Sequence, residues 1–94
     1  MIWTWDDAKS RANKRAHGLE FETAQLVFDD PLSLSRRDSY PLEIRWQTMG
    51  MIGNVVVFVV HTWPETEDGV GRIISARRAT ARERRVYEED GDFP

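Results

Sequence analysis

Three side chains near the C-terminus could together carry out acid–base chemistry on a phosphate ester. Arg77 could hold two phosphate oxygens with its guanidinium fork, and Glu83 could act as a base. Tyr87, one helical turn after Glu83, could donate a proton or stack on a nucleobase. Each residue also has a structural interpretation: Arg77 could pair with an acidic neighbour, Glu83 could close a capping box with Thr80, and Tyr87 could cover the core. Both interpretations stay open at this point.

A second set of polar residues recurs every four positions along an expected N-terminal helix: Lys9, Asn13 and His17. This stripe could donate hydrogen bonds to an RNA backbone, and histidine is the side chain best suited to acid–base catalysis near neutral pH. A solvated helix face or local hydrogen bonding is the alternative. His61 lies within an apolar run and is expected in the core or at an interface. The four tryptophans are expected in the core rather than stacked on RNA bases.

Further arginines are candidates for binding phosphate groups. Arg45 lies on a predicted strand, and Arg78 directly follows Arg77. Arg72 and Arg77 are five positions apart on one predicted strand, and an odd separation places them on opposite faces. We therefore expect Arg77 to face a ligand, while Arg72 could stabilise the acidic loop that precedes it. A salt bridge to an acidic neighbour is the alternative for either residue.

The basic residues are concentrated in two blocks of an otherwise acidic chain. The 94 residues include 13 lysines and arginines and 16 acidic residues, for a net charge of −3. Residues 9–15 carry a net charge of +4 and residues 72–87 a net charge of +5, so a phosphate-bearing partner could bind locally. There is no cysteine, which excludes a disulfide scaffold and a thiolate metal site. We expect neither a metal nor a cofactor.

The chain shows no segment typical of a membrane protein or a secreted protein. Its longest apolar run, residues 55–60, is far shorter than the roughly 20 residues that cross a bilayer. The first residues lack a basic segment followed by an apolar one, so they do not form a signal peptide. We expect a single cytoplasmic domain over residues 1–94.

Hydrophobic patterns predict the helices and strands that must position these side chains. A short β-prone start precedes a helix over residues 7–17, with Asp6 as its N-cap and Gly18 after its end. Alanines at every fourth position of this helix (Ala8, Ala12 and Ala16) are expected to pack on a sheet. A second helix is predicted over residues 21–28.

The rest of the chain is predicted to be mainly β. Strands are expected over residues 32–35, 43–49, 55–63 and 70–77, and the last three form an antiparallel meander with 55–63 at its centre. A capping box at Thr80 predicts a final helix that runs to about Glu89. The order β-α-α-β-β-β-β-α is that of an α+β fold: a small twisted, mainly antiparallel sheet with two N-terminal helices and one C-terminal helix.

Four segments form a recognisable pattern in this order and spacing. They are Trp5-Asp6-x-x-Lys9-x-x-x-Asn13-x-x-x-His17-Gly18-x-x-Phe21-x-x-Ala24, then Phe28-x-Asp30-Pro31, then Arg45-x-x-x-x-Gly50, and finally Arg72-Ile73-Ile74-Ser75-Ala76-Arg77-x-Ala79-x-x-x-Glu83-x-x-x-Tyr87. Together they resemble the BrnT family of bacterial type II toxins, over nearly the whole chain. One position departs from the family pattern: Ala16 stands where the family usually has a lysine.

The resemblance implies a RelE-like fold and a ribonuclease that inhibits translation and arrests growth. RNA cleavage by attack of the 2′-hydroxyl needs no metal if side chains supply a base, cations and an acid. We expect these roles to fall to Arg77, Glu83, Tyr87, Lys9 and His17, with RNA binding by Arg45, Asn13, Arg72 and Arg78.

The resemblance also implies a partner protein, a BrnA-like antitoxin whose dimer would hold two toxin copies. That antitoxin would carry the DNA-binding part, so this chain would meet DNA only through it. A binding module without catalytic activity, using the same basic surface, is the alternative function. Convergence of the candidate residues on one open hollow would favour catalysis, whereas residues that are paired and buried would favour the binding module.

Overall fold

A five-stranded sheet with the strand order β1-β5-β4-β3-β2 forms the centre of the molecule. The computed structural model describes residues 2–90 and 93. The strands are β1 (Ile2–Thr4), β2 (Leu34–Arg37), β3 (Trp46–Ile52), β4 (Val55–His61) and β5 (Val70–Arg78). The helical segments are α1 (Asp7–His17), α2 (Phe21–Ala24), the 3₁₀ segment η1 (Gln25–Asp29), α3 (Ala81–Arg85) and the π turn η2 (Val86–Asp90). The predicted α+β order is confirmed.

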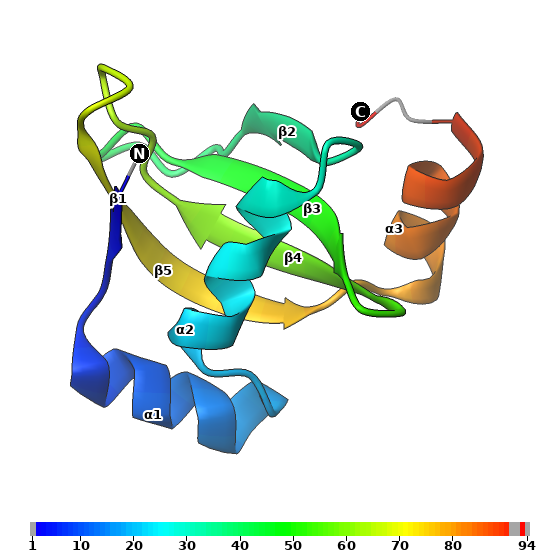
Figure 1. Ribbon diagram of the computed structural model, residues 1–94, viewed down its shortest axis with the longest axis horizontal. Helices are drawn as coiled ribbons and strands as arrows, with labels where there is room; N and C mark the ends of the chain where they lie inside the picture. Colours follow the sequence, from blue (N-terminus) through cyan, green and yellow to red (C-terminus); the bar gives the residue numbers. More distant parts are fainter. Residues whose placement is uncertain (1, 91–92, 94) are drawn as a thin grey trace.

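The strands after η1 pair as an antiparallel sheet, and only β1 is parallel to its neighbour, β5. The predicted meander is therefore confirmed, with β4 between β3 and β5. Figure 1 shows α2 crossing one face of the sheet, α1 lying below β5, and α3 at the end of the sheet where β5 finishes. This arrangement leaves α1 and α3 well apart.

Local signals set the ends of α1, but its contact with the sheet is polar. The Asp6 carboxylate accepts a hydrogen bond from the Lys9 backbone amide at 3.0 Å, and Gly18 ends the helix with φ of 75°. The buried residues of α1 are Ser10 and Asn13, whereas all three alanines of the predicted stripe are exposed. The alanine prediction is wrong because hydrogen bonds orient this helix; the Ser10 hydroxyl, for example, accepts from the Phe21 amide at 2.9 Å.

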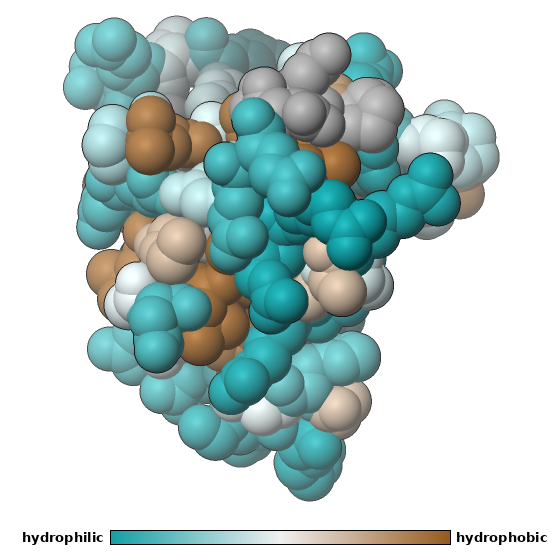
Figure 2. Space-filling model, turned by 90° about the vertical axis from the view of Figure 1, so that its right-hand side faces the viewer, coloured by the Kyte–Doolittle hydropathy of each residue, from teal (hydrophilic) through white to brown (hydrophobic). Residues whose placement is uncertain are grey.

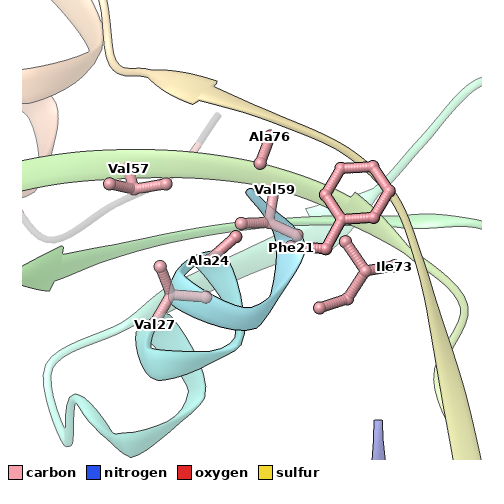
Figure 3. Close-up of a cluster of buried hydrophobic side chains, with 7 residues drawn as sticks. All are labelled: Phe21, Ala24, Val27, Val57, Val59, Ile73 and Ala76. Carbon is pink, nitrogen blue, oxygen red and sulfur yellow. The ribbon is translucent and has the colours of Figure 1, made fainter. Parts of the chain in front are cut away.

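One cluster of buried apolar side chains joins the helical layer to the sheet (Figure 3). Its members come from α2 and η1 on one side and from β4 and β5 on the other: Phe21, Ala24, Val27, Val57, Val59, Ile73 and Ala76. Gly50 lets β3 approach this layer, because a Cβ there would lie 2.9 Å from the backbone oxygen of Val27. The core therefore lies between the sheet and α2–η1.

A β-bulge in β5 changes which side chains share a face of the sheet. Val60 pairs with Ser75 but His61 pairs with Ile73, so Ile74 is an extra residue. As a result Ile73 and Ala76 both face the helical layer, although their separation is odd. Arg72 and Arg77 then share the opposite face. The prediction that they lie on opposite faces is wrong, because the simple two-residue period does not hold across a bulge.

Two strands begin later than predicted because side chains hold the preceding residues in loops. The Asp30 carboxylate accepts from the Leu32 amide at 2.9 Å, and β2 starts only at Leu34. Before β3, Arg45 contacts Glu43 at 3.0 Å, and β3 starts at Trp46. Arg45 therefore precedes the strand on which it was predicted. The final predicted helix is present as α3 followed by η2.

Candidate active site

Arg77 and Glu83 form a two-fold ion pair where β5 leads into α3. The Nη1–Oε1 distance is 2.7 Å and the Nη2–Oε2 distance is 3.0 Å. The guanidinium also lies over the Phe58 ring, 4.2 Å from its centroid. The hydrogen bond from Arg77 is the main cause that lowers the pKa of Glu83, and the same bond raises the pKa of Arg77. Glu83 is thus a carboxylate at neutral pH, held beside a fixed cation.

The predicted capping box is also present, and it uses the same carboxylate. Glu83 Oε1 accepts from the Thr80 amide at 2.8 Å, and the Thr80 hydroxyl accepts from the Glu83 amide at 3.1 Å. The capping role and the ion pair therefore occur together. This double use fixes the orientation of the Glu83 carboxylate and, through it, that of Arg77.

Tyr87 is paired with a residue that was not among the sequence-based candidates, Asp30. The Tyr87 hydroxyl donates to Asp30 Oδ2, which also accepts from the Met51 amide at 2.8 Å. Burial, followed by the Asp30 carboxylate, raises the pKa of Tyr87 to about 12. Burial raises the pKa of Asp30, but the hydrogen bonds it accepts outweigh this and lower it overall. Tyr87 is therefore a neutral phenol. The motif Phe28-x-Asp30-Pro31 included Asp30, but nothing in the sequence indicated that Asp30 is the partner of Tyr87.

Two hollows adjoin this part of the molecule, and both are lined by arginines. One, of about 250 Å³, is lined by Arg36, Arg82, Glu83, Val86 and Phe93. The other, of about 430 Å³, contains Arg78 and Arg84 beside the turn that connects β3 to β4. Figure 2 shows a mainly hydrophilic surface at this end of the molecule, with apolar patches beside it. A phosphate ester could reach Glu83 and several cations here.

A comparison with known protein families identifies the family to which the chain belongs. Residues 5–83 match the family described as ribonuclease toxin, BrnT, of type II toxin–antitoxin system. The chain belongs to the BrnT family. Its relatives are ribonuclease toxins, and a type II system implies an antitoxin partner and an RNA target. No curated protein matches the chain.

The match to BrnT includes every candidate residue except Tyr87, but the structure does not bring all of them together. Lys9 and His17 are exposed on α1, and Figure 1 shows this helix well separated from α3. Asn13 is only 8% exposed. Its Nδ2 donates to the carbonyl oxygens of Leu19 at 2.8 Å and Ala76 at 2.7 Å, and its Oδ1 accepts from the Ala76 amide at 3.3 Å. In this BrnT chain Asn13 fixes the backbone next to Arg77.

The two remaining arginine candidates meet at the other end of β5. Arg72 Nη2 lies 2.7 Å and Arg45 Nε 3.0 Å from the same oxygen of Glu43, and Arg45 also lies over the Tyr40 ring at 3.8 Å. The hydrogen bonds from Arg45 and Arg72 lower the pKa of Glu43. The prediction that Arg72 stabilises the acidic loop at residues 64–69 is wrong, because the ion-pair partner of Arg72 is Glu43. Of the candidate residues, those that lie around α3 are therefore Arg77, Arg78, Glu83 and Tyr87.

Within residues 2–90 and 93, no three histidine or acidic side chains lie close enough to hold a metal ion. In the same part of the chain, no helix is both long and apolar enough to cross a membrane.

Proposed function

We propose that this BrnT chain is a cytoplasmic, metal-independent endoribonuclease whose chemistry takes place at the Arg77–Glu83 pair. The observation that carries the proposal is a carboxylate fixed between a cation and a hollow lined by further arginines, within the segment that matches the ribonuclease family. By cleaving RNA, the chain would inhibit translation and arrest growth.

Each step of the proposed reaction uses a side chain of this site. The Glu83 carboxylate takes the proton from the 2′-hydroxyl of the RNA, and the 2′-oxygen then attacks the phosphorus. The bond from phosphorus to the 5′-oxygen breaks, which leaves a 2′,3′-cyclic phosphate. Tyr87 supplies the proton for the departing 5′-oxygen, and for this its hydroxyl must leave Asp30. Arg77 stabilises the charge that grows on the phosphate oxygens. We assign no chemical step to Lys9 or His17.

A specific observation favours the second candidate, a binding module without catalytic activity. Arg77 and Tyr87 are both already paired in the structure, Arg77 with Glu83 and Tyr87 with Asp30. If these contacts persist when RNA binds, Arg78 and Arg84 would hold the RNA without cleaving it.

Inducible expression in a bacterium tests the proposal by growth and by RNA integrity. Arg77→Ala should lower cleavage by ~10²–10³. Arg77→Lys should also be impaired, because a point charge cannot replace the planar fork. Arg72→Ala is the matched control, since it removes an arginine that is also ion-paired on the same strand and face. This variant should lose much less cleavage activity than Arg77→Ala. Circular dichroism confirms folding of each variant.

Two results would overturn this function. If a folded Arg77→Ala chain still cleaves RNA at the parent rate, the assignment of the active site to the Arg77–Glu83 pair is refuted. Cleavage by the purified chain should continue in EDTA, so activity that EDTA abolishes and magnesium restores refutes the metal-independent mechanism.

We further propose that a BrnA-like antitoxin, in a 2:2 complex built on an antitoxin dimer, neutralises the chain by covering residues 72–85. This span contains six arginines and one glutamate, which favours rapid binding of an acidic segment. Antitoxin and RNA should then compete, with DNA bound only by the antitoxin. A binding assay in which RNA and antitoxin bind at the same time and independently contradicts this arrangement.

A further inference from the structure

A hollow with aromatic walls lies on the helical side of the sheet, whereas Arg77 lies on the opposite side. We call it the aromatic pocket; its volume is about 340 Å³. Its walls include Trp3, Phe28 and Trp63, and its polar groups are the side chains of Gln25, Asp29 and Ser33. This volume is near the lower end for small-molecule sites, which suits one long side chain better than a large cofactor.

The aromatic walls pack against one another and leave one indole open to solvent. Trp3 stacks on Phe28 with ring centroids 3.8 Å apart, and Trp63 stands nearly perpendicular to both, at 82° and 79°. Trp63 is 43% exposed, so its prediction as a core residue is wrong. It also borders a second, apolar hollow of about 210 Å³ with Trp46. Trp63 thus offers ring surface to a ligand on two sides.

The polar side chains of the aromatic pocket have no hydrogen-bond or ion-pair partner among residues 2–90 and 93; they are those of Gln25, Asp29 and Ser33. Among the described residues that line the pocket, Asp29 is the only charged one. An unpaired carboxylate beside exposed ring surface is the combination that binds organic cations.

The charge around the aromatic pocket also favours a cation over RNA. Glu65, Glu67 and Asp68 follow Trp63 in the loop between β4 and β5, and all three are exposed. Arg37 is a nearby cation, but it lies on β2 beside Trp46, next to the second hollow. Phosphate groups would be repelled by the acidic loop and by Asp29, whereas a basic segment of a protein would be attracted.

We propose that the aromatic pocket binds an arginine side chain of a partner protein, with the guanidinium against Trp63 and its fork on Asp29. Arginine fits better than lysine because it is planar, stacks on an indole and bonds a carboxylate through two nitrogens. The identification of the partner as the antitoxin rests on the proposed function. The pocket would anchor that protein at a point separate from residues 72–85, the basic span that the antitoxin is proposed to cover.

The test is a titration of the full chain with N-acetylarginine amide, followed by NMR of the tryptophan indole N–H signals. The signals of Trp63 and Trp3 should shift, and N-acetyllysine amide should bind more weakly. Asp29→Asn should weaken arginine binding by about tenfold, the loss of one charge-assisted contact. Asp68→Asn is the matched control: it removes the same charge from the adjacent loop and should leave the affinity nearly unchanged.

Three outcomes would overturn the proposal. The first is the absence of any shift at Trp63. The second is an equal effect of Asp29→Asn and Asp68→Asn, which would mean diffuse attraction rather than a contact. The third is guanosine binding as tightly as arginine amide, which would make the pocket a nucleobase site. RNA cleavage by the unaltered chain is measured in parallel, so a chain that binds arginine but does not cleave RNA refutes only the proposed function.

Discussion

Mild acid should destabilise the fold through one buried histidine, His61. Its side chain is 0% exposed, with Nδ1 2.9 Å from the Thr62 carbonyl oxygen and Nε2 2.6 Å from the Thr48 hydroxyl. Because a carbonyl oxygen can only accept, Nδ1 carries the proton and Nε2 accepts from Thr48. Burial lowers the pKa of His61 to about 4. The ring is therefore neutral in the folded chain.

The size of the effect follows from the gap between the folded and unfolded pKa of His61. The unfolded value is 6.5 and the folded value about 4. Between these pH values the unfolded chain binds a proton that the folded chain does not. The stabilisation is complete above about pH 6.5 and is lost as pH falls toward 4, at up to about 1.4 kcal/mol per pH unit and about 3 kcal/mol in all.

Urea unfolding followed by tryptophan fluorescence, from about pH 7.5 to about pH 4.5, measures this loss. The parent chain and His17→Gln, which changes the exposed histidine, should lose stability with the same slope. His61→Gln should give a flatter curve, because no group at that position titrates. If His61→Gln does not fold, NMR titration of the parent replaces it, and the His61 ring should stay neutral down to about pH 5. A His61 ring that titrates near 6.5, or equal slopes for all three chains, refutes the reasoning.

Three further substitutions test individual contacts. Asn13→Ala leaves backbone groups without partners and should lower the free energy of unfolding by about 2–3 kcal/mol in the same urea assay; parent-like stability would show that water replaces the amide. Gly71→Ala places a Cβ against the Trp3 ring and should cost about 1–3 kcal/mol, unless the indole moves, which its fluorescence would reveal. Tyr87→Phe removes the bond to Asp30 and should raise the pKa of that carboxyl, measured by NMR; an unchanged value would mean that the backbone amides alone hold it down.

The helix ends could be predicted because their signals are local. The Asp6 cap, the Gly18 stop and the capping box of Thr80 with Glu83 each involve residues within a few positions of one another. Such contacts form wherever the chain makes a helix, so the residue types alone indicate them. The same box positions one member of the candidate site, since Glu83 is also the partner of Arg77.

The contacts that the sequence did not reveal join distant positions or break a period. Tyr87 and Asp30 are 57 positions apart, and Asn13 and Ala76 are 63 apart, so neither spacing nor residue type identifies the pair. The bulge at Ile74 adds one residue to an otherwise regular strand, and nothing in the apolar run marks it. That single residue reversed the predicted relation between the arginines of β5, which shows how weakly a two-residue period constrains a bulged strand.

The bond between Asn13 and Ala76 has a consequence for how this protein behaves in solution. β4 pairs with one side of β5, but β1 covers the other side only over residues 70–72. Beyond them β5 is an edge strand, and such an edge can recruit a strand from another molecule. The Asn13 amide satisfies both backbone groups of Ala76 and places α1 over this edge. One side chain thereby occupies the backbone groups that Ala76 would otherwise offer to a strand of another molecule.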